Sequence, residues 1–169
     1  MTFQSTVNIS LAFGVVGEQS VEGPNRVVKR PVNSAGANPN VVGYAFTALN
    51  STGVASVGGA ITNGTSIFAG LLVNPKVYSS AGGSTGPLSP TLAIPDNTDG
   101  EFALMGQYFA ALTSAANIGD QVIYNTTTGA LAAVAPGAAA GTGNAYVPNC
   151  FVDNFPTSAA GIVSVRLTN

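Results

Sequence analysis

The chain has 169 residues, of which only 7% are charged; it contains no histidine, and its formal net charge is −2. Soluble globular proteins carry roughly 25% charged residues, so this surface must be built mainly from Ser, Thr, Asn, Gly and Ala, and such a surface promotes association. The composition argues against an enzyme, which needs titratable groups, and a sequence pI near 4.7 argues against a nucleic-acid-binding protein.

The length suits one domain, or one domain with an elaborated arm. No stretch approaches the roughly 20 apolar residues of a membrane-spanning helix, and the N-terminus lacks the basic and apolar regions of a secretory signal. We therefore expect synthesis in the cytoplasm and no membrane contact. Cys150 is the lone cysteine and has no histidine or basic cluster beside it in the sequence, so we predict a buried structural thiol.

The N-terminal residues alternate between apolar and polar side chains. The apolar side chains occupy odd positions: Phe3, Val7, Ile9, Leu11, Phe13 and Val15. This period indicates a β-strand with one buried face, on the order of 40 Å long at about 3.3 Å per residue. Such a strand can pair within its own sheet or with a neighbouring molecule.

Residues 17–40 lose this pattern and are rich in Gly, Pro and Asn. We predict a functional loop, or an arm that a partner orders. The loop holds Arg26, Lys29 and Arg30, which either face solvent or contact a protein partner. The sequence thus divides into an N-terminal strand and loop arm, 1–40, and a β-rich domain, 41–169.

Further strands are predicted over residues 41–48 and 66–73, with a turn over 50–53 between them. The second of these is a continuous apolar run, which is typical of a strand buried on both faces. The loop over 79–90 contains a glycine-rich stretch, but it lacks the lysine and the strand-to-helix context of a phosphate-binding loop.

Residues 102–112 fit both a helical and a strand period, and the preceding turn and the β-rich surroundings favour a strand. Asp96, Asp99 and Glu101 precede this segment. They either form a turn or hold calcium, but their spacing does not match an EF-hand loop. We therefore predict no metal and no cofactor.

Residues 118–124 and 130–134 flank Asn125–Gly129 and predict a hairpin. An Ala/Gly-rich loop follows, and then strands over 146–153 and 161–168. Many short strands, with 21 Gly and 10 Pro, predict an all-β fold. The expected architecture is a compact β-sandwich or β-barrel with an extended N-terminal strand or arm and long Gly/Pro-rich loops.

Several short segments, spread over nearly the whole chain, carry a resemblance to a known family. They are Met1–Ile9, Phe68–Lys76, Asp99–Gly106, Ile118–Leu131, Val147–Asn149 and Val163–Thr168. These segments resemble the cement, or head decoration, proteins of tailed bacteriophages.

The resemblance implies a β-rich structural subunit, not an enzyme, on the outer surface of the capsid in the virion. Such a subunit binds the major capsid protein and bridges neighbouring capsid subunits. We expect a homo-oligomer, a trimer first and a dimer second. The residues predicted to form the protein interface are Phe3, Val7, Ile9, Leu11, Phe13, Arg26, Lys29 and Arg30.

Two alternative functions stay open at this point. One is a tail, baseplate or fibre component, which is structural as well. The other is a carbohydrate- or host-surface-binding β-module, which fits the Thr/Asn/Gly-rich loops but has no Trp for an aromatic platform.

Overall fold

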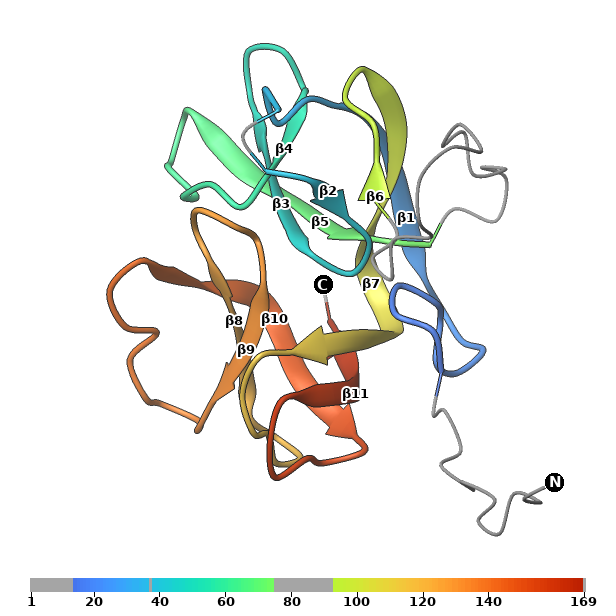
Figure 1. The fold of residues 1–169 in the computed structure, drawn as a ribbon, viewed down its shortest axis with the longest axis vertical. Helices are drawn as coiled ribbons and strands as arrows, with labels where there is room; N and C mark the ends of the chain where they lie inside the picture. The colour runs from blue at the N-terminus through green and yellow to red at the C-terminus, as the bar shows by residue number, and fades with distance from the viewer. Residues whose placement is uncertain (1–13, 37, 75–92, 169) are drawn as a thin grey trace, which may run out of the picture.

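The computed structural model describes residues 14–36, 38–74 and 93–168, and within these ranges the chain is all-β, without a helix (Figure 1). The strand predicted over residues 3–15 lies outside the described residues, except for Gly14 and Val15, which are not in a strand. The glycine-rich loop over 79–90 lies outside them as well.

Most strands of the described residues are short. They are β1 (Arg26–Val32), β2 (Asn40–Val41), β3 (Ala45–Leu49), β4 (Ala55–Val57), β5 (Ser66–Leu72), β6 (Ala93–Ile94), β7 (Thr98–Leu112), β8 (Gln121–Asn125), β9 (Leu131–Val134), β10 (Asn144–Asn154) and β11 (Gly161–Leu167).

The longest of these strands, β7, takes part in two closed rings. Its first half pairs antiparallel with β1 and β5, and the order β1-β4-β3-β5-β7 closes a mixed five-stranded barrel among the described residues. The pairing of β1 with β4 is the parallel one. The second half of β7 pairs with β11, and the sheet continues through β10 and β8 to β9. A parallel pairing of Leu131 on β9 with Leu112 on β7 closes the second ring. The expected barrel is therefore confirmed.

The core consists of two apolar clusters, and the larger of them also includes Ala45, Leu71 and Ala103 of the first ring. The first ring holds Phe46 and Phe102, whose ring centroids lie 5.2 Å apart. The second ring holds Tyr124, Leu131 and Cys150, all fully buried. Burial of each large side chain stabilises the fold by about 1.5–3 kcal/mol. The buried position of Cys150 confirms the structural thiol predicted from the sequence.

The rings also meet away from β7, where the turn between β8 and β9 lies against β3 and β4. The Ala45 N–H donates to the Gly129 carbonyl at 2.9 Å, and the Gly59 N–H donates to the Thr126 carbonyl at 2.7 Å. A Cβ atom on Gly129 would lie 2.7 Å from the Ala45 oxygen, and its φ is +74°. Only glycine permits this approach of two backbones.

The predicted hairpin of β8 and β9 is confirmed, as are the strand over 102–112 and the strands over 146–153 and 161–168. The loop predicted over 17–40 is wrong in part, because β1 lies within it. In β1, apolar and charged side chains do not alternate regularly, and one face of the strand stays exposed. The division of the chain at residue 40 stays a prediction.

The single strand predicted over residues 41–48 is also wrong, because the chain turns between β2 and β3. Gly43 lies in the turn with φ at +83°, and its N–H donates to the Leu72 carbonyl at 2.7 Å. Alternating side chains alone do not reveal such a break, since the apolar pattern continues across it.

Candidate interaction surface

Residues 14–25, which precede β1 and are called the arm from here on, are fixed to the middle of β7. Three backbone hydrogen bonds hold it there: Gly17 N–H to Phe109 O at 2.8 Å, Phe109 N–H to Glu18 O at 2.9 Å and Ser20 N–H to Gln107 O at 2.9 Å. This pairing occupies the edge of β7 opposite β11, between the part that pairs with β1 and the contact with β9. The arm therefore lies where the two rings adjoin.

Two glycines allow this close seating. A Cβ atom on Gly17 would lie 2.3 Å from Val42 Cγ1 and 2.8 Å from the Asn74 nitrogen, which donates to Gly17 O at 3.0 Å. On the facing turn, a Cβ atom on Gly43 would lie 2.2 Å from Val16 Cγ1. Both glycines have positive φ, which a larger residue adopts only with strain.

An aromatic pair lies beside Gly14, the first described residue of the arm. A Cβ atom on Gly14 would lie 2.3 Å from the ring of Phe109, which stacks on Phe155 at a centroid distance of 6.2 Å. Val15 beside it is 54% exposed. The structure therefore places the residue that directly follows the predicted interface segment. The segment's own side chains, Phe3, Val7, Ile9, Leu11 and Phe13, lie outside the described residues.

The three predicted cations lie on β1 and are brought together on one strand, not in a loop. Lys29 is exposed, and its Nζ lies 3.3 Å from Glu101 Oε1 on β7. Arg26 is exposed opposite Met105. Arg30 is half-buried, and its Nε atom is buried without a hydrogen-bond partner among the described residues. Because Lys29 is paired with Glu101 of β7, the surface around β1 carries charges of both signs, unlike a nucleic-acid-binding patch.

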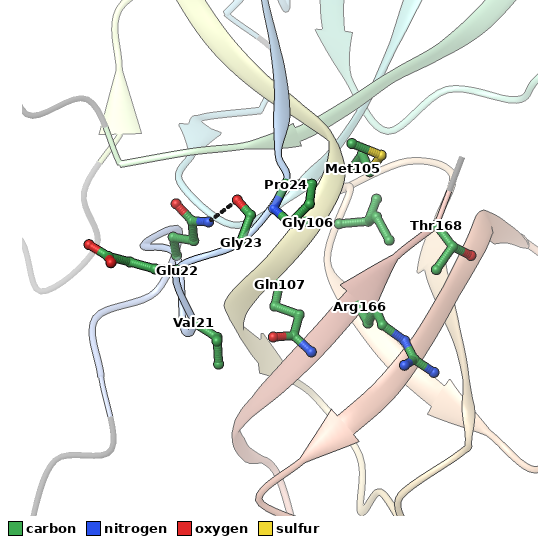
Figure 2. A pocket seen from close by; sticks show the side chains of 11 residues that line it. Val21, Glu22, Gly23, Pro24, Met105, Gly106, Gln107, Arg166 and Thr168 are labelled. Carbon is green, nitrogen blue, oxygen red and sulfur yellow. Dashed lines mark hydrogen bonds between the residues drawn. The ribbon is translucent and has the colours of Figure 1, made fainter.

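A hollow of about 520 Å³ opens beside the arm (Figure 2). Its walls come from the arm over 19–24, from Met105–Gln107 of β7 and from Arg166–Thr168 at the end of the chain. Val21 on its wall is 56% exposed. No sequence motif could have revealed this hollow, because three distant segments build it.

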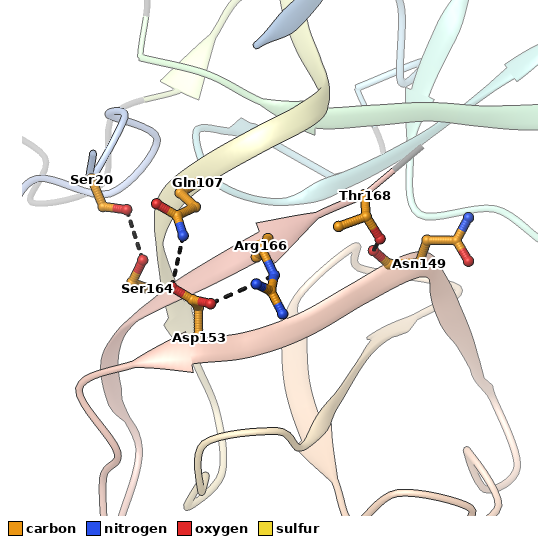
Figure 3. Close-up of polar contacts among 7 residues, drawn as sticks. All are labelled: Ser20, Gln107, Asn149, Asp153, Ser164, Arg166 and Thr168. Carbon is orange, nitrogen blue, oxygen red and sulfur yellow. Dashed lines mark hydrogen bonds and ion pairs between the residues drawn. The ribbon is translucent and has the colours of Figure 1, made fainter. Parts of the chain in front are cut away.

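Polar contacts beside the hollow join β7, β10 and β11, and a separate hydrogen bond joins β11 to the arm (Figure 3). Asp153 accepts a hydrogen bond from Gln107 Nε2 at 2.8 Å and pairs with Arg166 Nε at 3.5 Å. Ser20 and Ser164 share a hydrogen bond between their hydroxyl oxygens at 2.7 Å. These contacts fix strands and arm to each other, and they supply no activated nucleophile or acid–base pair.

The acids considered for calcium have structural partners instead. Asp96 lies in a turn and accepts hydrogen bonds from Asn40 Nδ2 at 2.9 Å, from the Ser34 N–H at 2.7 Å and from the Gly36 N–H at 2.9 Å. These hydrogen bonds, that from Asn40 first, lower the pKa of Asp96. Glu101 lies on β7, away from the turn, so the turn interpretation is confirmed for Asp96 alone. Within the described part of the chain, no group of three His, Cys, Asp or Glu side chains could hold a metal.

The described residues also contain no helix long and apolar enough to cross a membrane. The described residues thus define a two-ring β-fold whose arm is anchored to β7 by backbone hydrogen bonds.

The chain matches the family described as structural cement protein (E217 gp24/Pam3 gp6) over residues 3–168, and it belongs to that family. It is therefore a structural cement protein of a phage capsid and a component of the virion, as the resemblance in its sequence implied. The family is one of structural proteins, not of enzymes.

Among solved structures, the chain is similar to a chain in the capsid of Myoviridae phage XM1, with a TM-score of 0.63 and 18% identity. The match covers 100% of this chain and 99% of that chain, so the two share their fold. No curated protein matches the chain.

Proposed function

We propose that the chain binds the outer surface of an assembled phage head and bridges neighbouring major capsid subunits. Residues 1–13 act as the clamp, and the cations of β1 add a second contact. The observation that carries this proposal is the anchored arm: Gly17 and Phe109 fix the point from which the alternating apolar segment departs. A segment attached to a rigid body loses less entropy when it binds than a free chain does.

Binding only to the assembled shell stabilises the shell by mass action. Two linked contacts also raise the apparent affinity by about 10²–10⁴ over either contact alone. A homo-oligomer multiplies this effect, and we keep a trimer as the first expectation and a dimer as the second.

Arg30 supports a role for β1 in binding. A buried nitrogen without a hydrogen-bond partner costs about 1–3 kcal/mol of folding free energy, and Arg30 Nε is such an atom among the described residues. An Arg retained at this cost is expected to serve an interaction. Replacing it by Met should leave stability unchanged or higher and should weaken binding to the shell.

The clamp is tested by deleting residues 1–13, which leaves the hydrogen bonds between residues 17–20 and β7 intact. The variant and the full chain are added to shells that lack this protein, and occupancy is measured by sedimentation and electron microscopy. We expect a loss of at least about 100-fold in apparent affinity. Ile118→Ala, a change at an exposed residue outside the arm and outside β1, should bind like the full chain. Full occupancy by the truncated chain would contradict the clamp.

The second contact is tested by replacing Arg26, Lys29 and Arg30 together by Gln. Shell binding should weaken and lose part of its dependence on salt, because fewer charges are desolvated or paired. The control is Asp120→Asn, which removes a charge from the loop before β8 and leaves β1 unchanged. Unchanged affinity and salt dependence of the triple variant would remove β1 from the interface.

A further inference from the structure

The connection between β4 and β5 carries an asparagine followed by a glycine, Asn63–Gly64. This is the only place in the sequence where a glycine follows an asparagine. Asparagine is among the thermally labile residues. Glycine has no side chain to shield its backbone nitrogen, and its backbone reaches conformations that other residues avoid. The amide carbon of Asn63 is therefore open to attack by the backbone nitrogen of the next residue.

The hydrogen bonds of this turn leave both reacting groups unengaged. The N–H groups of Thr65 and Ser66 both donate to the Thr62 carbonyl, at 3.0 Å and 2.9 Å. These bonds span the pair, and the Gly64 N–H has no hydrogen-bond partner among the described residues. The Asn63 side chain has no partner in the described part of the chain either. The reaction therefore requires no hydrogen bond within the protein to break first.

The tip of the connection is open, whereas its base is fixed. Asn63 and Gly64 are exposed, Gly64 has a φ of +78°, and a Cβ atom there would meet no atom within 4 Å apart from its chain neighbours. At the base, the Ser66 hydroxyl donates to the Ala60 carbonyl at 2.7 Å, and the Gly59 N–H donates to the Thr126 carbonyl at 2.7 Å. Water thus reaches the tip, and a covalent change there leaves the strands in place.

The pair Asp99–Gly100 provides a contrast within the same chain, because an aspartate before a glycine can close the same ring. This pair lies in β7, where it is paired with Pro31 and Arg30 of β1, and Gly100 is buried. The sheet holds its backbone in an extended conformation. The exposed turn imposes no such restraint on Asn63–Gly64.

We propose that Asn63 is a site of spontaneous deamidation. The Gly64 nitrogen forms a bond to Asn63 Cγ and loses its proton, and the side-chain nitrogen leaves with that proton as ammonia, which closes a succinimide ring. Solvent water then opens the ring at either carbonyl. One opening gives aspartate, and the other gives isoaspartate, in which the chain continues through the side-chain carbon. Nothing is oxidised or reduced, and water is the sole co-reactant.

The product has a charge where the parent chain has none. Residues 31–75 contain no Asp, Glu, Lys or Arg, so the carboxylate at position 63 is the first charge in this run and makes the net charge of −2 more negative by one unit. A virion makes no new protein, so altered copies of this cement protein accumulate as the particle ages. The inference concerns the chain itself and does not rest on the clamp or on the cations of β1.

The test follows the folded full chain over time at mildly alkaline pH. Ion-exchange chromatography should show a growing species shifted by one negative charge, and peptide mapping by mass spectrometry should place both aspartate and isoaspartate at position 63. Asn50, which is also exposed but is followed by Ser51, is the internal reference and should change later.

Two variants test the chemistry. Gly64→Ala should slow the change at position 63 to the rate of the other exposed asparagines, because the added methyl group hinders the attacking nitrogen. Asn63→Gln keeps a side-chain amide before the glycine but lengthens the side chain, so that closing the ring is unfavourable. It should give no acidic species over the same period. Circular dichroism checks that each variant is folded.

Three outcomes would overturn the proposal. The first is an unchanged Asn63 at a time when Asn50 has begun to change. The second is a change at Asn63 that occurs only after urea has unfolded the chain, which would show that the turn protects it. The third is a Gly64→Ala chain that changes as fast as the parent chain, which would exclude attack by an unhindered Gly64 nitrogen.

Discussion

The hydroxyl of Tyr124 donates a hydrogen bond to the carbonyl oxygen of Gly59 at 2.8 Å, and this contact links the second ring to the first. Tyr124 belongs to β8 and is fully buried in the second apolar cluster, whereas Gly59 follows β4 of the first barrel. Burial raises the pKa of Tyr124, so its hydroxyl remains a donor throughout the neutral range. The two rings are thus joined by a side chain as well as by the shared strand β7.

Tyr124→Phe should lower the free energy of unfolding by about 1 kcal/mol, because the hydrogen bond is lost and the Gly59 oxygen loses its partner. Urea unfolding followed by fluorescence or circular dichroism measures the change. Tyr146→Phe is the matched control, since the Tyr146 hydroxyl donates to the Ala138 carbonyl at an exposed site and should matter less. An equal loss of unfolding free energy at both positions would show that the hydrogen bond between the rings stabilises the fold no more than an exposed one.

Gly17→Ala should release the arm from β7. The new Cβ atom would lie 2.3 Å from Val42 Cγ1 at a φ of +80°, and strain plus overlap should cost about 3 kcal/mol at this seat. Limited proteolysis should then cleave the arm faster than in the parent chain. Gly64→Ala separates the two causes: its φ is +78°, but a Cβ atom there meets nothing within 4 Å. It should show strain alone, about 1 kcal/mol. Protection of the arm in Gly17→Ala would refute the seating described above.

Asp96 should make stability depend on pH in the acid range. Its pKa is lowered in the folded chain by hydrogen bonds, of which that from Asn40 is the largest cause. The folded state therefore binds this proton less readily than the unfolded state, whose carboxyl has a pKa near 3.9. The contribution is fully present above about pH 4 and is lost as the pH falls through the lowered pKa.

Asp96→Asn should remove this acid-dependent part and should destabilise the chain by about 1 kcal/mol at pH 7, after allowance for partial exposure. Unfolding free energies at pH 6 and pH 3 measure both effects. Glu22→Gln removes a carboxyl from an exposed position of the arm and should keep the acid-dependent loss. If Asp96→Asn lost as much stability between the two pH values as the parent chain does, the assignment to Asp96 would fail.

The elements that sequence alone predicted correctly are those whose pattern is local. The hairpin around Asn125–Gly129 needs only two apolar runs and a turn that ends in glycine. The strand over 102–112 needs an apolar segment together with the turn before it and its β-rich surroundings. The seat of the arm could not be predicted in this way, because Gly17, Val42 and Phe109 are far apart in the sequence. The same holds for the hollow beside the arm, whose three walls are distant from each other in the sequence.

Composition was the less reliable guide at β1. Arg26, Lys29 and Arg30 fall in the predicted loop, since the alternating pattern gives way to Gly, Pro and Asn over residues 17–40. A strand at the exposed side of a barrel tolerates such residues, because only one of its faces is buried, and Pro31 fits where β1 pairs with β4 at Val32 alone. The clustering of the three cations was nevertheless visible from their spacing, which places all of them on one short segment.

Cys150 should resist thiol reagents in the folded chain. It is fully buried in the second apolar cluster, and burial raises the pKa of its thiol, so the reactive thiolate is scarce and shielded. Reaction with a disulfide reagent at pH 8 should be at least about 100-fold slower than in denaturant, because it must await opening of the second ring. Cys150→Ala/Ser158→Cys moves the thiol to an exposed loop and should react at similar rates in both conditions. Fast reaction of the folded parent chain would mean that the second ring opens often, and that its apolar cluster stabilises the fold less than its burial implies.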